Sequence, residues 1–215
     1  IIGLGTGNRI ALGNKGRVDI EITVRGRAAH SSMPENGVNA VDGFRRVLER
    51  LDRMAHGAGH PDRGRATLTV TQVRSGPEIS HTIPDICRVV LDRRLLPGED
   101  PDDSFGEIQN ALDEVTGWSV EVTRGAFMYP SEVTRDCPLA LATAAAYRAL
   151  TREEAGWFYS SAALDAGLLN REGIATIMFG PGDLRFAHTD QEAVPLQEVR
   201  DAAKIYAVTA LHLLA

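Results

Sequence analysis

Two histidines of this sequence have neighbours that would let an imidazole ring take part in catalysis or binding. His30 follows two alanines and precedes a Ser-Ser pair, and His188 follows an alanine near the other end of the chain. An imidazole ring can donate or accept a hydrogen bond, transfer a proton or bind a metal ion. No second cluster of His, Asp and Glu with the spacing of metal ligands lies between or before them. The sequence therefore predicts only half of an active site.

His188 comes after a turn rich in Gly and Asp, at the carboxyl end of a predicted buried strand over residues 175–179. Ligands of open α/β sheets bind at that end of the strands. Zinc sites need three or four protein ligands, so one histidine is a weak metal signal. The alternative interpretation of both His30 and His188 is a surface-loop histidine that bonds only to nearby backbone.

Other polar residues near strand ends suggest substrate contacts. Of the adjacent Arg93 and Arg94, we expect one to be a solvated charge at the edge of the sheet. The other is expected to bind a substrate carboxylate through its planar fork. His81 lies in a polar loop between two predicted strands. The alternative interpretation of this loop is a turn fixed by Pro84, with no role in binding. Ser161 lacks a G-x-S-x-G context, which argues against a serine hydrolase.

The first part of the chain predicts a sheet with two helices. Apolar and polar residues alternate from Val18 to Arg25, which is the period of a strand with one wet face. An apolar stripe at helical spacing predicts a helix over residues 36–54. The stripe consists of Val38, Val41, Phe44, Leu48 and Leu51. The remaining elements are strands over 66–73, 86–95 and 119–123 and a helix that begins at Pro101. This order predicts the split βαβ, or ferredoxin-like, arrangement over residues 17–124.

Beyond residue 124, helices and short apolar strands alternate, which predicts an α/β layer. Helices are expected over 139–150 and 163–169 and from Pro195 onward, and strands over 157–159 and 175–179. In the last helix the apolar residues that share a face are Val199, Ala202, Ala203, Tyr206 and Ala210. The fold class is therefore α/β, of the α+β type: a ferredoxin-like βαββαβ domain plus part of a mixed α/β domain. We divide the chain into a leading segment and hinge (1–16), a lid (17–124) and a remaining part (125–215).

Composition excludes some classes of function. The net charge of −6 argues against a nucleic-acid or membrane-surface partner. Apolar stretches such as 140–146 are far shorter than a membrane span, and no signal-peptide pattern is present. Cys87 and Cys137 lack a Cys-x-x-Cys context, so we expect inert thiols in a reducing cytoplasm. The chain opens inside a predicted strand at Ile1, so we expect it to be part of a larger protein.

Six segments, taken in order, resemble the dimeric zinc aminoacylase and carboxypeptidase family. That family includes acetylornithine deacetylase, succinyl-diaminopimelate desuccinylase and the glutamate carboxypeptidases. Gly-Asn-Lys-Gly-Arg at 13–17 and Gly-Arg-Ala-Ala-His-Ser at 26–31 are similar to the start and first loop of its lid, or dimerisation, domain. The other matching segments are residues 83–85, 92–94, 161–167 and 180–189. The resemblance covers nearly the whole chain and implies the carboxyl-terminal portion of such an enzyme.

The resemblance implies metal-assisted hydrolysis of an amide in an N-acyl amino acid or short peptide. Zinc would polarise the carbonyl group and lower the pKa of its bound water. His188 matches the last metal ligand, and His30 would cross a homodimer interface, formed by the lids, to hydrogen-bond the developing oxyanion. The implied substrate-binding residues are Arg94, His81, Ser161 and Gly182. Residues 125–215 would then be the carboxyl-terminal part of the catalytic domain.

One motif departs from the family. Where relatives carry Gly-Glu-Pro-Thr with a metal-binding glutamate, this chain has Gly-Leu-Gly-Thr, with Leu4 at the glutamate position. Leucine cannot coordinate zinc, and the other ligands of the family lie upstream of Ile1. We therefore expect this chain alone to retain no zinc and to be inactive. Two functions stay open: a metal-dependent amidohydrolase completed by upstream residues, or a non-catalytic, metal-free dimerisation or carboxylate-binding protein.

Overall fold

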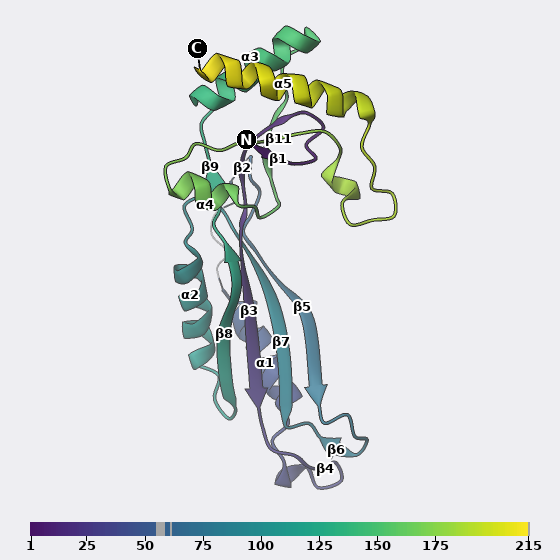
Figure 1. The fold of residues 1–215 in the computed structure, drawn as a ribbon. Coiled ribbons are helices and arrows are strands. Elements are labelled where there is room, and N and C mark those ends of the chain that lie inside the picture. The colour runs from purple at the N-terminus through teal and green to yellow at the C-terminus, as the bar shows by residue number, and fades with distance from the viewer. Residues whose placement is uncertain (55–58, 61, 215) are drawn as a thin grey trace.

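The computed structural model describes residues 1–54, 59–60 and 62–214. Figure 1 shows a body from which a long arm extends, with both chain termini in the body. The arm carries a four-stranded sheet and, at its far end, a two-stranded one, whereas the body carries a five-stranded sheet. Among the described residues, no helix is both long enough and apolar enough to cross a membrane.

The arm is a four-stranded antiparallel sheet with two helices packed on it. In spatial order its strands are β5 (Thr67–Gly76), β7 (Ile86–Leu95), β3 (Gly16–Arg25) and β8 (Ser119–Met128). The helices are α1 (Ala40–Leu51), which contacts β3 and β7, and α2 (Pro101–Asp113), which contacts β3 and β8. Along the chain the order is βαββαβ. The ferredoxin-like prediction is confirmed.

One face of this sheet forms the core of the arm. Alternate side chains of β3 are buried, and the pairing with β7 sets Val24 opposite Cys87 and Ile20 opposite Leu91. The buried faces of the two strands therefore coincide. Each fully buried side chain of this size stabilises the fold by about 1.5–3 kcal/mol. The buried members of the core are Val18, Ile20, Ile22, Val24, Ala40, Val47, Leu51, Cys87, Val89, Leu91, Leu95, Ile108, Leu112 and Val115.

Helix α1 is shorter than the predicted helix over 36–54, and the side of it that is buried differs from the predicted one. Asn39 ends the preceding extended segment, and its side chain accepts a hydrogen bond from the Val41 N–H at 2.9 Å. Such an N-cap starts a helix at the next residue. Val41 is 40% exposed, so its predicted burial is wrong. The residues that are buried are Ala40, Gly43, Val47 and Leu51, because small residues let the helix approach the sheet closely.

The body contains a mixed five-stranded sheet. Its strands are β1 (Ile2–Gly3), β11 (Met178–Phe179), β2 (Ile10–Asn14) and β10 (Trp157–Ser160), in that order, with β9 (Ser131–Glu132) paired to β2. Three helices accompany it: α3 (Pro138–Thr151), α4 (Ala166–Arg171) and α5 (Leu196–Leu214). α3 and α5 pack against each other and share a core with the sheet. The predicted α/β layer is confirmed.

Three details of the body differ from the predictions. α4 begins at Ala166 rather than at residue 163, and the strand expected over 175–179 pairs only at Met178–Phe179. In α5 the fully buried residues are Ala202, Ile205 and Thr209. Val199, which was expected on the same face as Ala202, is 39% exposed. Strand β8 continues to Met128, beyond the proposed boundary after residue 124, and the three-part division of the chain stays a prediction.

Candidate functional site

The tip of the arm brings His30 and His81 together. A two-residue strand, β4 (Ala29–His30), pairs with β6 (Thr82–Ile83), so that His30 lies opposite Thr82. The backbone N–H of Ser31 donates to the carbonyl oxygen of His81 at 2.8 Å. Both imidazoles are exposed. Two histidines that are 51 positions apart in the sequence therefore share one exposed surface.

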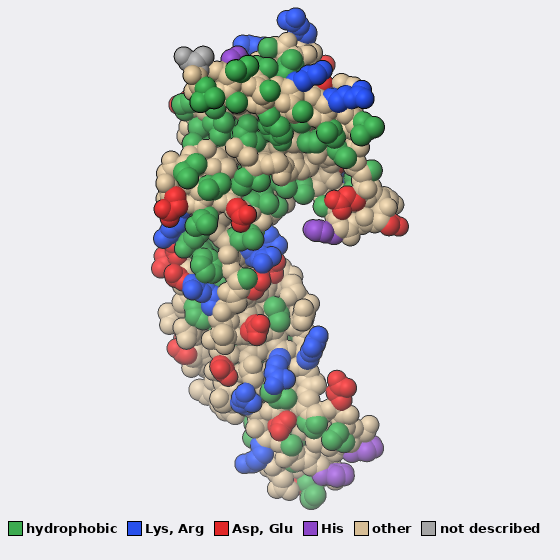
Figure 2. Space-filling model, in the orientation of Figure 1, with side chains coloured by type: hydrophobic (Ala, Val, Ile, Leu, Met, Phe, Trp, Pro, Cys, Tyr) green, Lys and Arg blue, Asp and Glu red, His purple; other side chains and the backbone are tan. Residues whose placement is uncertain are grey.

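His188 lies in the body, in the loop after the short 3₁₀ helix η2 (Leu184–Phe186). It is exposed, its φ is +64°, and its backbone N–H donates to the Glu192 carboxylate at 3.0 Å. Strand β3, with ten residues, separates the body from the tip that carries His30. Such a strand spans about 33 Å. Figure 2 shows histidine side chains at the far end of the arm and on the overhanging part of the body, with a concave side between them. One copy of the chain does not bring His30 to His188.

The described residues do not provide a zinc ligand set. No group of three or more His, Cys, Asp or Glu side chains in this part of the chain converges in a way that could hold a metal ion. The Leu4 side chain is half-buried and packs against the apolar cluster of Ala11, Ala166 and Met178. Its position thus contributes apolar packing and no metal coordination.

The two adjacent arginines have different partners. Arg94 forms a bidentate pair with Asp92, with Nε and Nη2 at 2.7 and 2.9 Å from the two carboxylate oxygens. Arg93 is 5% exposed and donates to Glu99 at 3.2 Å. The expectation that one arginine is a solvated edge charge is wrong, because β7 lies between β5 and β3. A substrate carboxylate would have to displace Asp92 to use the Nε/Nη2 edge of Arg94, which is the edge that Asp92 occupies.

Ser161 lines a cavity of about 620 Å³ in the body. The Arg9 guanidinium lies 4.3 Å from the centre of the Phe158 ring at the same cavity. Also on this cavity, the hydrogen bond from the Arg185 guanidinium lowers the pKa of the Asp183 carboxyl. The cavity therefore offers a serine hydroxyl and an exposed guanidinium, Arg9, to a polar ligand.

Gly182 is buried and has a φ of +87°, which favours glycine. Its N–H donates to the Glu198 carboxylate at 2.8 Å, and its carbonyl accepts from the Gly7 N–H at 2.6 Å. Gly182 also lines a second cavity of about 470 Å³. The backbone N–H and carbonyl of Gly182, which was predicted to bind substrate, are thus both hydrogen-bonded within the chain.

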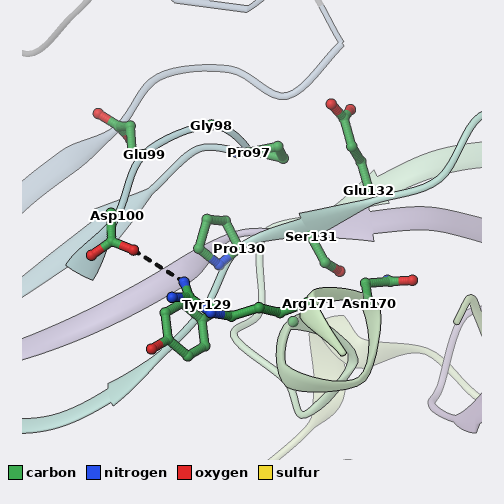
Figure 3. A pocket seen from close by; sticks show the side chains of 11 residues that line it. Pro97, Gly98, Glu99, Asp100, Tyr129, Pro130, Ser131, Glu132, Asn170 and Arg171 are labelled. Atoms are coloured by element: carbon green, nitrogen blue, oxygen red, sulfur yellow. Dashed lines mark hydrogen bonds and ion pairs between the residues drawn. The ribbon is translucent and has the colours of Figure 1, made fainter. Parts of the chain in front are cut away.

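The junction between body and arm holds contacts that the sequence did not indicate. A cavity of about 260 Å³ lies there, with the side chains shown in Figure 3. Arg171 of α4 lies 3.1 Å from the Asp100 carboxylate, which caps α2, and 4.2 Å from the centre of the Tyr129 ring. A Cβ atom on Gly167 would overlap the Tyr129 carbonyl oxygen. No local pattern marks Asp100 and Arg171 as partners, because they are 71 positions apart.

The family model described as "Peptidase dimerisation domain" matches residues 12–119. Acetylornithine deacetylase of Myxococcus xanthus is 27% identical over 93% of this chain and 53% of its own length. An Escherichia coli K12 protein named YgeY is 29% identical over 94% of the chain and 54% of its own length.

A solved structure, aminopeptidase PepT of Bacillus cereus, superposes with a TM-score of 0.78 at 17% identity, over 98% of this chain and 55% of that one. At this identity the likeness shows the fold alone. The chain spans about half the length of the curated relatives it matches. Since the family model covers half of the chain and the arm has the same fold, this chain belongs to the M20 peptidase dimerisation domain family.

Proposed function

We propose that this chain is the lid and carboxyl-terminal part of a metal-dependent amidohydrolase that cleaves N-acyl amino acids or short peptides. The family and the acetylornithine deacetylase relative support the hydrolysis of amides. The observation that carries the proposal is the position of His30, exposed at the end of an arm. An exposed imidazole so far from the body of its own chain is suited to act on the active site of a second copy.

A homodimer would supply that second copy. β5 stands at one end of the strand order in the arm, and an edge strand offers unpaired backbone groups to another chain. Val70 and Val73 lie on the helix-side face of β5, opposite the buried Leu91 and Val89. They are nevertheless 37% and 49% exposed. Pairing of two β5 strands would cover these valines and extend the sheet across the dimer.

In the proposed reaction, attack of water on the amide carbonyl places negative charge on its oxygen. An N–H group of His30 from the partner subunit donates to this oxyanion. Metal ions in the family supply Lewis-acid chemistry, and we propose that the remaining metal ligands come from outside these 215 residues. Arg94, His81, Ser161 and Gly182 stay proposals for substrate contacts, although Asp92 already occupies the Nε/Nη2 edge of Arg94.

The test uses the natural protein, purified whole, with its intact mass recorded. We expect a panel of N-acyl amino acids and dipeptides to include a substrate whose hydrolysis a chelator abolishes and zinc restores. His30→Ala is expected to lower kcat by about 100- to 1000-fold, as loss of one oxyanion donor does. Bound zinc and dimerisation should stay unchanged. Glu35→Ala, at an exposed site on the same tip, is the matched control. Unchanged turnover in His30→Ala, or loss of its zinc, contradicts the assignment.

Mixing of two inactive variants tests the crossing of the interface. A heterodimer of His30→Ala and His188→Ala subunits has one site with both groups intact if His30 acts on the partner. Random mixing in a two-fold dimer should restore about one quarter of the wild-type activity. Recovery near zero, with heterodimers present by mass spectrometry, shows that His30 does not act across the interface.

Leu4 favours a second candidate function, a non-catalytic dimerisation or carboxylate-binding protein. Its apolar side chain is packed where the family carries a metal-binding glutamate. If the natural protein shows no hydrolase activity and binds no stoichiometric zinc, this second function is the correct one. Leu4→Glu is the informative variant, since zinc binding gained through it identifies a family site that has lost one ligand.

A further inference from the structure

Ser32 makes two contacts with the imidazole of His30. The Ser32 backbone N–H donates to Nδ1 at 3.2 Å, and the Ser32 Oγ lies 2.8 Å from the same ring nitrogen. The side chain of the neighbouring Ser31 has no hydrogen bond to the described residues. The second serine of the pair is thus the one whose side chain meets the histidine.

The backbone contact decides which nitrogen of the ring carries the proton. An amide N–H can only donate, so Nδ1 of His30 must be the acceptor. A neutral imidazole has one N–H, which therefore sits on Nε2. In this state Nδ1 has its lone pair directed to Ser32 and Nε2 has a proton to donate. The ring is then ready to donate a hydrogen bond through Nε2, and neither nitrogen has a free lone pair for a metal ion.

The surrounding backbone holds this arrangement in place. The Met33 N–H donates to the His30 carbonyl oxygen at 2.9 Å, which closes a turn around Ser31 and Ser32. The Ser31 N–H is bonded to the His81 carbonyl oxygen at 2.8 Å. The pairing of β4 with β6 continues this ladder. Ser32 therefore contacts the ring from a turn whose backbone is held by hydrogen bonds at Ser31 and at Met33.

We propose that Ser32 is a positioning residue that fixes His30 as the Nε2–H tautomer. The inference rests on the proposed function of His30 as an oxyanion donor and adds which nitrogen donates. It also separates a donor from a metal ligand, because a metal on Nε2 would require a proton on Nδ1, which could not accept the hydrogen bond from the Ser32 backbone N–H. No substrate or metal is needed to test it.

The test is NMR of this 215-residue chain with ¹⁵N-labelled histidine, in which the two ring nitrogens give different shifts. His30→Gln assigns the signal. At a pH where His30 is neutral, we expect the Nε2–H tautomer in the wild type. Ser32→Ala keeps the backbone N–H and removes only the hydrogen bond of the hydroxyl to Nδ1. The Nε2–H tautomer should therefore stay in the majority, while the ratio of Nε2–H to Nδ1–H falls by about 2- to 10-fold, the effect of one hydrogen bond. Ser32→Thr, which keeps the hydroxyl, should restore the ratio, and Ser31→Ala should leave it unchanged.

A wild-type ring that is mainly Nδ1–H overturns the inference. It is equally overturned if Ser31→Ala shifts the ratio as much as Ser32→Ala does, or if Ser32→Ala shifts nothing. The signals of the other histidines report whether each variant is folded. In the active natural protein, Ser32→Ala should lower kcat and leave KM unchanged. A shifted tautomer with unchanged kcat supports the fixing of the ring by Ser32 and contradicts the proposed role of His30.

Discussion

At the scale of single residues, the partners of a side chain decide its role. Arg93 and Arg94 are neighbours in the sequence, but a strand sends successive side chains to opposite faces. Arg93 is consequently buried beside Glu99, whereas Arg94 pairs with Asp92 on the other face.

Tyr206 is a comparable case in the body. Its hydroxyl donates to the Phe179 carbonyl oxygen, and its ring meets the Phe179 ring edge-on at 5.8 Å.

Tyr206→Phe tests this contact. Loss of one hydrogen bond should lower the free energy of unfolding at pH 7 by about 0.5–1.5 kcal/mol. Burial raises the pKa of Tyr206 above its ordinary value. The folded state therefore keeps the phenolic proton at a pH where the unfolded state releases it. This stabilisation is fully present below the unfolded pKa of about 10 and is lost as the pH rises through the folded pKa.

Urea unfolding of both proteins between pH 7 and pH 11 measures the effect. The stability difference between wild type and Tyr206→Phe should shrink above pH 10, because the phenylalanine variant has no proton to release. Tyr147→Phe is the matched control, since Tyr147 also meets the Phe179 ring edge-on and has no hydroxyl hydrogen bond to the described residues. A stability difference that does not change with pH contradicts the role of the buried hydroxyl.

At the scale of elements, close packing decides where a helix can lie. A Cβ atom on Gly43 of α1 would come within 2.7 Å of both the Trp118 ring and a methyl carbon of Val24. The Trp118 indole N–H in turn donates to the Asn39 carbonyl oxygen, just before the helix, at 2.8 Å. Gly43 thus lets α1 approach the sheet. Gly106 of α2 has no atom within 4 Å of a Cβ built on it among the described residues.

Alanine substitutions at these two glycines should have opposite effects. Gly43→Ala forces the helix or the indole to move and should destabilise the arm by about 1–3 kcal/mol. Gly106→Ala should stabilise it by about 0.5–1 kcal/mol, because alanine loses less conformational freedom in a helix. Denaturant unfolding of both variants gives the comparison. Equal stabilities for the two variants contradict the packing of α1 described here.

At the scale of the whole molecule, a body and an arm are joined at a junction held by Arg171. The ion pair with Asp100 and the contact with Tyr129 connect α4 of the body to the cap of α2 and to the residue that follows β8 of the arm. The concave side of the molecule and the exposed edge strand β5 follow from this shape. A second copy that pairs at β5 would extend the sheet across both arms.

Val73→Asp tests the β5 interface. A charge at the core of an interface is disfavoured, so the dimer dissociation constant should rise at least about 10-fold, or 1.4 kcal/mol. Thr123→Asp introduces the same charge at an exposed site on β8, at the other end of the strand order, and should have no effect. Sedimentation across a concentration series measures both. If the wild-type chain stays monomeric at high micromolar concentration, the proposal of a homodimer is wrong.

Much of the fold could be predicted from the sequence because it is encoded by local periodicity. The alternation from Val18 to Val24 and the β-branched run over Ile86–Leu95 locate two central strands. Pro101 locates the start of α2. The rotation of α1 and α5 was missed, because the buried side of a helix depends on how closely its small residues let it approach its neighbours.

The sequence by itself determined the order of elements, the ferredoxin-like class of the arm and the family resemblance carried by short motifs. Only the tertiary structure decided that His30 and His81 share a tip, that Arg94 is held by Asp92 and that Arg171 joins body to arm. It also decided that the arm separates His30 from His188 in space within one copy of the chain. The reason is physical: periodicity is a property of neighbouring residues, whereas these distances are set by strand register and by contacts between segments far apart in the sequence.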